Sequence, residues 1–289
     1  MRLLKRGGNG TGYCASGTIF RRKRLKPRDI HSAFKTKRGE NMFTASILPT
    51  AQIDCDERML FWHGDILKRR RINCFAYLLQ DAEHKILIDT GVWDLDAVNR
   101  TKKGADRWRM EGDDQNILSH LRARGIHPDE IEELVLTHGH YDHAGAAWLF
   151  QHARVYLQAK EWDVIFSPEN PMRGELGALR DYLKQSQAEG RVHLLTGNGV
   201  TQCGVQLMAS PGHTLGSQMA LAETLQRRTL FTGDAVFMLA NLEENLPIGF
   251  SVDEEGSAQA LEYCRQFDGL ILTGHDPRCV EMLGRGENV

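Results

Sequence analysis

A short histidine-rich segment constrains this chain more than any other feature of its sequence. Residues 137–143 read THGHYDH, so three imidazoles (His138, His140 and His143) and the carboxylate of Asp142 fall within six residues. Side chains two positions apart point in different directions on a helix, so a loop that leaves a strand is expected to bring these four together. Neutral imidazole and carboxylate suit zinc and similar ions. The segment predicts a metal-binding loop. The alternative is a surface loop that is rich in histidine by chance, which 12 His among 289 residues disfavour.

Three later residues have the surroundings expected of further ligands at the same centre. His213 lies in SPGHTLGS, Asp234 in TGDA and His275 in TGHDP, and each follows a β-like run and is flanked by glycine. Glycine lets the backbone bend sharply and approach a site closely. A single histidine of this kind is more often a surface or core residue. Three in the same context, downstream of the first segment, predict one shared site.

The pattern of short apolar runs indicates many strands with helices between them. Strands are expected over residues 74–79, 85–91, 133–136, 153–158, 192–195, 205–209, 219–221, 229–232 and 270–272. Helices are expected over residues 114–124, 179–187 and 257–266, and Gly125 is expected to terminate the first of them. Polar clusters repeatedly follow the predicted strands. This order favours sheets that helices cover, with a site assembled from loops.

The first 41 residues differ in composition from the remainder. They contain 12 Lys and Arg but only two acidic residues, whereas the whole chain has a net charge of −2, so residues 42–289 carry a net charge of −12. The basic segment is interpreted as a solvated extension or as translation from upstream of Met42. A nucleic-acid-binding arm and a transit segment are the alternatives. Residues 42–289 are expected to form one domain, whose acidic balance argues against nucleic acid as a partner.

Cysteine usage and hydropathy bear on the compartment. The six cysteines are scattered without a CxxC pair, no secretory segment is recognised, and no apolar run approaches the roughly 18 residues that a membrane span needs. These features predict a reduced, cytoplasmic protein that has a small-molecule substrate and no membrane association. A homodimer is left open.

The motifs, taken in order, resemble the metallo-β-lactamase superfamily. The motifs are LIDTG at residues 87–91, THGHYDH, SPGHTLGS, TGDA and TGHD, and the resemblance covers roughly residues 60–280. The resemblance implies an α+β fold, an αββα sandwich of two mixed sheets covered by helices, with metals at one edge between the sheets. Asp89, in the first motif, would support the metal loop.

The resemblance also implies a ligand set for two zinc ions, or for other divalent first-row metals. His138, His140 and His213 would hold one ion, Asp142, His143 and His275 the second, and Asp234 would bridge both. Two dications close together acidify a shared water and supply a bridging hydroxide near neutral pH. Asp142 and Asp234 are the candidate catalytic residues, and hydrolysis is the expected chemistry.

Four features separate the branches of the superfamily. Zinc β-lactamases have cysteine at the position of Asp234, and flavodiiron proteins have glutamate at that of His140. Glyoxalase II enzymes continue into a further domain, whereas 14 residues follow His275 here. The GHDP ending and the short C-terminus resemble N-acyl-homoserine lactonases. The predicted reaction is the opening of a lactone or a similar small cyclic ester. A thioester hydrolase of glyoxalase II type and a mononuclear iron sulfur dioxygenase are the alternatives.

One departure from the lactonase pattern concerns the substrate. Many of those enzymes have a tyrosine three residues after the bridging aspartate, where this chain has Phe237, which cannot donate a hydrogen bond. Phe237, Met238 and Trp62 are candidates to line an acyl pocket, although core packing is the competing interpretation. Whether Tyr141 points toward the substrate stays open, as does a lid role for residues 107–109.

Overall fold

The computed structural model describes residues 42–100, 107–109 and 116–284. The predicted basic extension, residues 1–41, lies outside the described residues. Within the described part, one sheet has the strand order β1-β2-β3-β4-β5-β6. Its strands are β1 (Thr44–Asp56), β2 (Arg69–Gln80), β3 (Lys85–Ile88), β4 (Glu133–Val135), β5 (Arg154–Gln158) and β6 (Val192–Leu195). The pairs β1/β2 and β2/β3 are antiparallel and the remaining three pairs are parallel.

The second sheet has the order β11-β10-β9-β8-β7. Its strands are β7 (Gly199–Val200), β8 (Gln206–Ala209), β9 (Gln218–Glu223), β10 (Arg228–Phe231) and β11 (Leu270–Leu272). Only the β10/β11 pair is parallel among these described strands. Both sheets are therefore mixed, as the sequence predicted.

Alternation along the strands packs the two sheets face to face. On β2, Phe75, Tyr77 and Leu79 enter a buried cluster that also contains Leu207 of β8 and Phe231 of β10. Successive side chains of a strand point to opposite faces. Ala76 and Leu78 of the same strand accordingly enter a second cluster, which holds the helices on the other side of this sheet.

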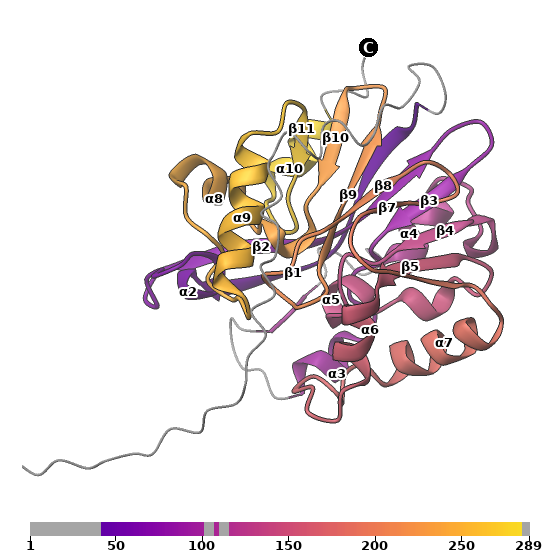
Figure 1. Ribbon diagram of the computed structural model, residues 1–289, viewed down its shortest axis with the longest axis horizontal. Coiled ribbons are helices and arrows are strands. Elements are labelled where there is room, and N and C mark those ends of the chain that lie inside the picture. Colours follow the sequence, from indigo (N-terminus) through magenta and orange to yellow (C-terminus); the bar gives the residue numbers. More distant parts are fainter. Residues whose placement is uncertain (1–41, 101–106, 110–115, 285–289) are drawn as a thin grey trace, which may run out of the picture. The chain divides into compact units, whose positions relative to one another are not determined.

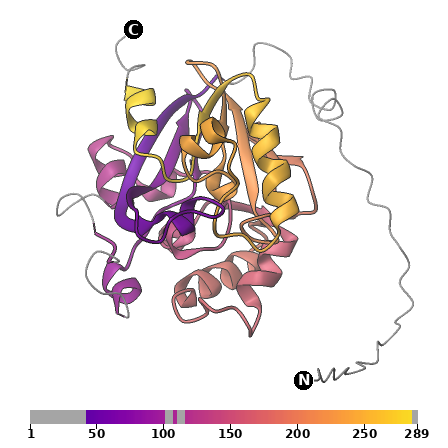
Figure 2. The ribbon, with the colours of Figure 1, turned by 90° about the vertical axis from the view of Figure 1, so that its left-hand side faces the viewer.

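Helices complete the two outer layers. The helices on the first sheet are α4 (Ile117–Ala123), α5 (Tyr141–Ala144), α6 (Ala159–Phe166) and α7 (Gly177–Ala188). On the outer side of the second sheet, Cys264 of α9 (Glu254–Arg265) contacts Met219 of β9. The other helices are α2 (Glu57–Leu60), α3 (Leu95–Asn99), α8 (Leu239–Glu244) and α10 (Arg278–Gly284). Figures 1 and 2 show α7 and α9 on opposite sides of the paired sheets. The predicted αββα sandwich is confirmed.

Strand β1 is the largest element that the sequence analysis did not anticipate. Pro49 interrupts its pattern, because proline cannot donate to a sheet ladder. In the structure β1 is an edge strand, and its pairing with β2 shifts register between Pro49 and Ala51. An edge position and a bulge are the two settings in which proline is tolerated within a sheet. By contrast, the predicted helix end at Gly125 is confirmed by its left-handed backbone, with φ of 69°.

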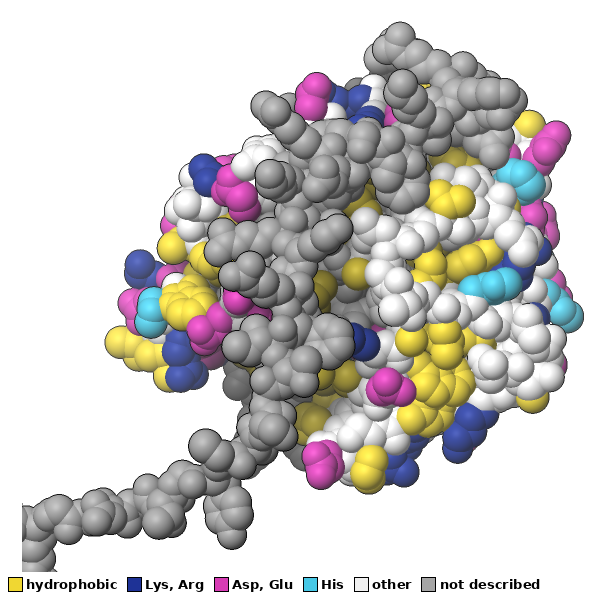
Figure 3. Space-filling view, viewed as in Figure 1, with side chains coloured by type: hydrophobic (Ala, Val, Ile, Leu, Met, Phe, Trp, Pro, Cys, Tyr) yellow, Lys and Arg dark blue, Asp and Glu magenta, His cyan; other side chains and the backbone are white. Residues whose placement is uncertain are grey.

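The described surface bears on nucleic acid and membrane, the two partners that the sequence argued against. None of the described helices combines the length and the apolar character that crossing a membrane requires. On the face drawn in Figure 3, the visible Lys and Arg side chains are interspersed with Asp and Glu. No continuous basic surface of the kind that nucleic-acid binding uses is visible on this part of the face.

Candidate metal centre

The seven predicted ligand residues come together where loops leave the ends of several strands. His138 and His140 lie between β4 and α5, and His213 lies between β8 and β9. The remaining four are Asp142 and His143 on α5, Asp234 in the 3₁₀ turn Gly233–Ala235 after β10, and His275 after β11. The loop predicted for the histidine-rich segment therefore ends at His140, and Asp142 and His143 lie in the short helix that follows. Strands from both sheets thus contribute, so the centre lies between the sheets.

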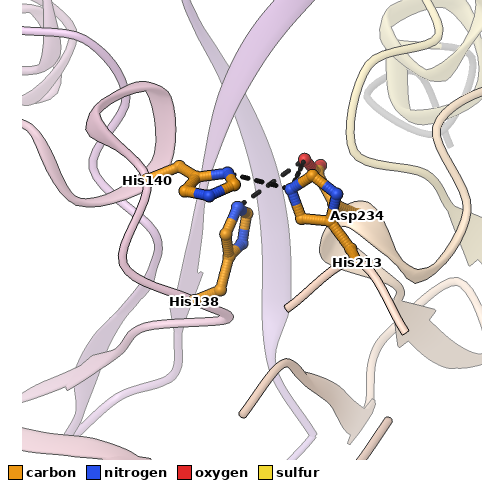
Figure 4. A group of neighbouring side chains, drawn as sticks. All are labelled: His138, His140, His213 and Asp234. Atoms are coloured by element: carbon orange, nitrogen blue, oxygen red, sulfur yellow. Dashed lines mark hydrogen bonds and ion pairs between the residues drawn. The ribbon is translucent and has the colours of Figure 1, made fainter. Parts of the chain in front are cut away.

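One group of ligand atoms surrounds the Oδ2 atom of Asp234 (Figure 4). The Nε2 atom of His213 lies 3.1 Å from Oδ2, and that of His138 lies 3.6 Å from it. The Nδ1 atom of His140 is 2.9 Å from His213 Nε2. These four side chains each offer one ligand atom, and all of these atoms lie within 4.8 Å of one another.

A second group surrounds the other oxygen of the same carboxylate. Asp234 Oδ1 lies 3.1 Å from the Nε2 atom of His143 and 3.0 Å from that of His275. The Oδ2 atom of Asp142 lies 3.8 Å and 4.0 Å from these two nitrogens. Each oxygen of Asp234 therefore faces a different set of imidazoles, which is the arrangement expected of a bridging ligand.

The chemistry of these donors fits two divalent cations. Three buried atoms that point into the centre, His138 Nε2, His143 Nε2 and Asp234 Oδ1, have no hydrogen-bond partner. A buried polar atom without a partner costs free energy, and native proteins leave few of them. Cations that accept the lone pairs of these nitrogens and oxygens would satisfy all three at once.

Hydrogen bonds on the outer side of the rings orient the inner nitrogens. The Nδ1 atom of His143 lies 2.8 Å from Asp89 Oδ2, and the corresponding atoms of His213 and His275 lie 3.0 Å and 2.7 Å from the backbone oxygens of Phe250 and Asn73. A proton on Nδ1 that is held in this way leaves Nε2 with a free lone pair. Partners of this type fix both the tautomer and the ring orientation of metal-binding histidines.

Asp89 has a further role, because it connects two parts of the metal loop. Besides holding His143, its carboxylate accepts hydrogen bonds from the Thr137 N–H at 2.8 Å and the Thr137 hydroxyl at 2.7 Å. Asp89 itself adopts a left-handed backbone with φ of 59°, an unusual and strained conformation for a residue other than glycine. The contacts support the role that the family resemblance implied for this residue.

Glu161, on α6, is a buried residue beside the centre to which the sequence analysis assigned no role. Its carboxylate accepts hydrogen bonds from the Gly139 N–H at 2.8 Å and from the Thr214 hydroxyl at 2.6 Å, so one buried side chain connects the loop of His138 and His140 with the loop of His213. Burial raises its pKa, although these hydrogen bonds oppose the change. No motif marks it, and the β5–α6 turn that positions it was not predicted.

Burial and mutual charge set the protonation of the ligands. Burial lowers the pKa of His138 well below its ordinary value, which keeps its imidazole neutral, as a metal ligand must be. Burial alone would raise the pKa of Asp234. The neighbouring imidazoles of His143, His275 and His213 more than offset this and hold its pKa well below its ordinary value. The Asp234 carboxylate is therefore ionised.

Two glycines allow the loops to approach one another as the sequence suggested. A Cβ atom on Gly274 would lie 2.6 Å from Asp234 Oδ1, and one on Gly233 would lie 2.7 Å from Thr137 Cβ. Gly233 also has a positive φ of 48°. Any larger side chain at position 274 would displace the Asp234 carboxylate.

Of the three residues predicted to line an acyl pocket, Phe237 and Met238 lie together, whereas Trp62 lies apart from them. The ring centroid of Phe237 lies 5.3 Å from those of both His213 and His275. Met238 shares a buried apolar cluster with Phe237 and Trp108, which Tyr141 also contacts. Trp62 is not part of this cluster, and its ring lies against that of His63.

Cys74, on β2, is a second residue near the centre to which the sequence analysis assigned no role. It is fully buried, and its Sγ atom lies 3.9 Å from Asp142 Oδ2, within reach of a weak S–H hydrogen bond. Burial, together with the charge of Asp142, raises its pKa well above the ordinary value. Cys74 is therefore a neutral thiol beneath the carboxylate of Asp142.

Comparison with known proteins identifies the family. A family model described as the metallo-beta-lactamase superfamily matches residues 69–275, and the chain belongs to this superfamily. An N-acyl homoserine lactonase of Bacillus thuringiensis is 29% identical over 213 residues, which cover 70% of this chain and 80% of the relative. The N-acyl homoserine lactonase AttM of Agrobacterium fabrum is 30% identical over 183 residues, which cover 59% of this chain and 67% of the relative.

Solved structures share the fold. A quorum-quenching N-acyl homoserine lactone lactonase superimposes with a TM-score of 0.68 at 24% identity, covering 83% of this chain and 95% of that one. AidC, described as a dizinc quorum-quenching lactonase, superimposes with a TM-score of 0.61 at 16% identity, covering 82% and 91%. The predicted superfamily is confirmed, and so is the resemblance to its N-acyl-homoserine lactonase branch.

Proposed function

We propose that this protein is a binuclear metal-dependent hydrolase that opens lactones, and that the seven converging side chains are its metal ligands. One observation carries the proposal: the two oxygens of the buried Asp234 carboxylate face two separate sets of imidazoles, at 3.0 to 3.6 Å. A mononuclear iron dioxygenase needs only two histidines and one carboxylate. A single iron would leave the second set of imidazoles and its carboxylate without a metal to bind.

The relatives indicate the metal and the substrate class. The curated relatives are named as N-acyl homoserine lactonases, and a structural neighbour is described as dizinc, so we assign two zinc ions and a lactone substrate to this chain. When bound, the two ions would acidify a shared water and polarise the ester carbonyl. Thioesters are the second substrate class to test, because the same ligand set serves their hydrolysis.

The side chains around the ligands determine what the protein itself contributes. Asp142 is more exposed than Asp234, with 13% of its side-chain surface accessible against 3%. It is therefore the carboxylate that can accept the proton lost by the attacking water and return it to the alkoxide of the opened lactone. Phe237 and Met238 would pack against apolar parts of the substrate. Trp62, predicted for the same pocket, lies outside their cluster and is a weaker candidate.

Metal analysis combined with a substrate panel tests the proposal. Purified without chelator, the protein should contain about two zinc ions per chain and should hydrolyse lactones faster than thioesters or β-lactams. Replacing the exposed His127 with alanine is the matched control and should change neither quantity. One iron per chain together with oxygen consumption on a sulfur substrate would instead support the dioxygenase. The cytoplasmic location and the homodimer stay predictions, which fractionation and size-exclusion chromatography would test.

A further inference from the structure

A hydrogen bond links Tyr141, inside the metal motif, to Trp108, 33 residues earlier. The indole N–H of Trp108 donates to the Tyr141 hydroxyl at 2.9 Å, and the two rings are perpendicular with centroids 6.2 Å apart. An indole N–H can only donate, so the phenol oxygen is the acceptor in this bond. Among the residues that the structure describes, no group accepts the hydrogen of the Tyr141 hydroxyl in return. Within residues 42–100, 107–109 and 116–284, the phenol therefore has a donor that no other group uses.

Trp108 is itself held firmly. The side-chain amide of Asn99 donates to the backbone carbonyl of Trp108 at 2.7 Å. The Oδ1 atom of Asn99 accepts from the backbone N–H of Trp108 at 2.8 Å. The next residue, Arg109, forms a two-way backbone bridge with Gln52 of β1, at 2.7 Å and 2.9 Å. These bonds hold the backbone that carries the indole, and the indole N–H in turn orients the Tyr141 hydroxyl.

Tyr141 also lies close to the centre. It stands between the proposed ligands His140 and Asp142 in the chain, and its ring contacts the apolar cluster of Trp108, Phe237 and Met238. Phe237, in that cluster, lies against one histidine from each set. A phenol is protonated near neutral pH, so the Tyr141 hydroxyl has a hydrogen to donate.

We propose that the Tyr141 hydroxyl donates a hydrogen bond to a carbonyl oxygen of the substrate, and that Trp108 is the residue that positions it. The inference rests on the proposed function. It resolves the missing donor at Phe237, because a phenol reaches the same apolar wall from the neighbouring loop. The substrate class is thereby narrowed to lactones that present a carbonyl toward Tyr141 while an apolar portion lies on Phe237 and Met238. The acceptor is either the ester carbonyl or the amide carbonyl of an acylamino substituent.

Steady-state kinetics of four variants on two lactone types test this inference. Tyr141→Phe should lower kcat/KM by about ten- to a hundredfold, the range for a hydrogen bond to a carbonyl that gains charge. Trp108→Phe, which keeps an aromatic ring, should lower it less. Phe237→Tyr in the Tyr141→Phe background should restore part of the loss. Tyr263→Phe, on α9, is the control and should retain wild-type kinetics.

The outcomes separate the two proposals. Zinc content and thermal unfolding temperature should be unchanged in Tyr141→Phe. If Tyr141 had a purely structural role, a large loss of kcat/KM would be accompanied by a loss of zinc or of thermal stability. A loss on both simple γ-lactones and acylamino lactones identifies the ester carbonyl, and a loss on acylamino lactones alone identifies the amide carbonyl. If the wild type opens lactones and Tyr141→Phe opens all of them equally well, the inference is wrong. If the wild type opens none, the proposed function is wrong.

Discussion

The two sets of ligands at the centre share Asp234 but differ in what surrounds them. In the first set, burial lowers the pKa values of His138, His140 and His213, so these rings are neutral without a metal. In the second set, burial also acts to lower the pKa of His143. The carboxylates of Asp234, Asp142 and Asp89 more than offset this and raise it well above the ordinary value. The second set is thus the more anionic half of the centre.

Each half also has a buried carboxylate behind it, and the two act differently. Asp89 touches a ligand ring directly, through His143 Nδ1 at 2.8 Å. Glu161 touches no ligand ring and instead holds two loops through Gly139 and Thr214. We infer that the second half depends on one oriented ring, whereas the first depends on the spacing of two loops. Replacing Asp89 and Glu161 one at a time separates these two kinds of support.

Removing Asp234, which both sets share, should weaken zinc binding in both halves of the centre. In Asp234→Ala both sets lose an oxygen, so zinc content should fall from about two ions to fewer than about one per chain. Lactone hydrolysis should fall by more than about a hundredfold, beyond the range for residues that only support a ligand. Elemental analysis and kinetics measure both effects. Asp268→Ala, on an exposed carboxylate, is the control. Retention of two ions by Asp234→Ala would contradict the bridging assignment.

Replacing Asp89 should weaken the second half selectively. In Asp89→Asn the group facing His143 loses its charge, and the affinity for one of two zinc ions should fall about 10- to 100-fold while the other changes little. Competition with a chromophoric chelator resolves the two affinities, and Asp181→Asn on the surface of α7 is the control. An equal loss at both sites would mean that Asp89 supports the whole loop rather than one ring.

Replacing Glu161 should affect the first half through its loops. Glu161→Gln keeps the size and an accepting oxygen, but a neutral acceptor is weaker, so we expect a loss of about 1 to 2 kcal/mol in the free energy of unfolding. The affinity for the zinc ion of the first set should fall less than tenfold. Asp163→Asn, an exposed position on the same helix, is the matched control. Urea unfolding with and without zinc measures the free energy of unfolding and the zinc affinity. An unchanged free energy of unfolding would contradict the inference that Glu161 holds the two loops together.

The same contrast shows what sequence reasoning can reach. The seven side chains that converge could all be named from the sequence, because each lies in a glycine-flanked motif whose residue types indicate metal binding without knowledge of the fold. Asp89 lies in such a motif too. Glu161 does not, because its role arises only when the turn between β5 and α6 packs against loops at residues 139 and 214, far away in the chain.

Strand β1 and the bond between Trp108 and Tyr141 escaped prediction for related reasons. Pro49 hides β1 from a pattern search, and only its position at the sheet edge, with a shift of register, makes the strand possible. Nothing in the sequence pairs Trp108 with Tyr141, and only the fold brings the indole nitrogen of Trp108 to 2.9 Å from the Tyr141 hydroxyl oxygen. Local motifs therefore specify the proposed metal ligands, whereas the residues packed around those ligands depend on long-range packing.

The smallest expected effect concerns Asp54, a carboxylate on β1 outside both halves. The guanidinium groups of Arg71 and Arg109, at 3.0 Å and 2.7 Å, lower its pKa to about 2. Because the folded value lies below the unfolded one, its contribution to stability is present above about pH 4, and it is lost as the pH falls toward 2. Asp54→Asn should therefore lower the free energy of unfolding at pH 7 by no more than about 1 kcal/mol, since these arginines are well exposed to solvent. About half of this difference should have disappeared by about pH 3. Urea unfolding of both proteins between pH 7 and pH 3 measures it, with Asp268→Asn as the control. A difference that stays constant over this range would show that the charge of Asp54 is not what holds Arg109, and with it Trp108, against β1.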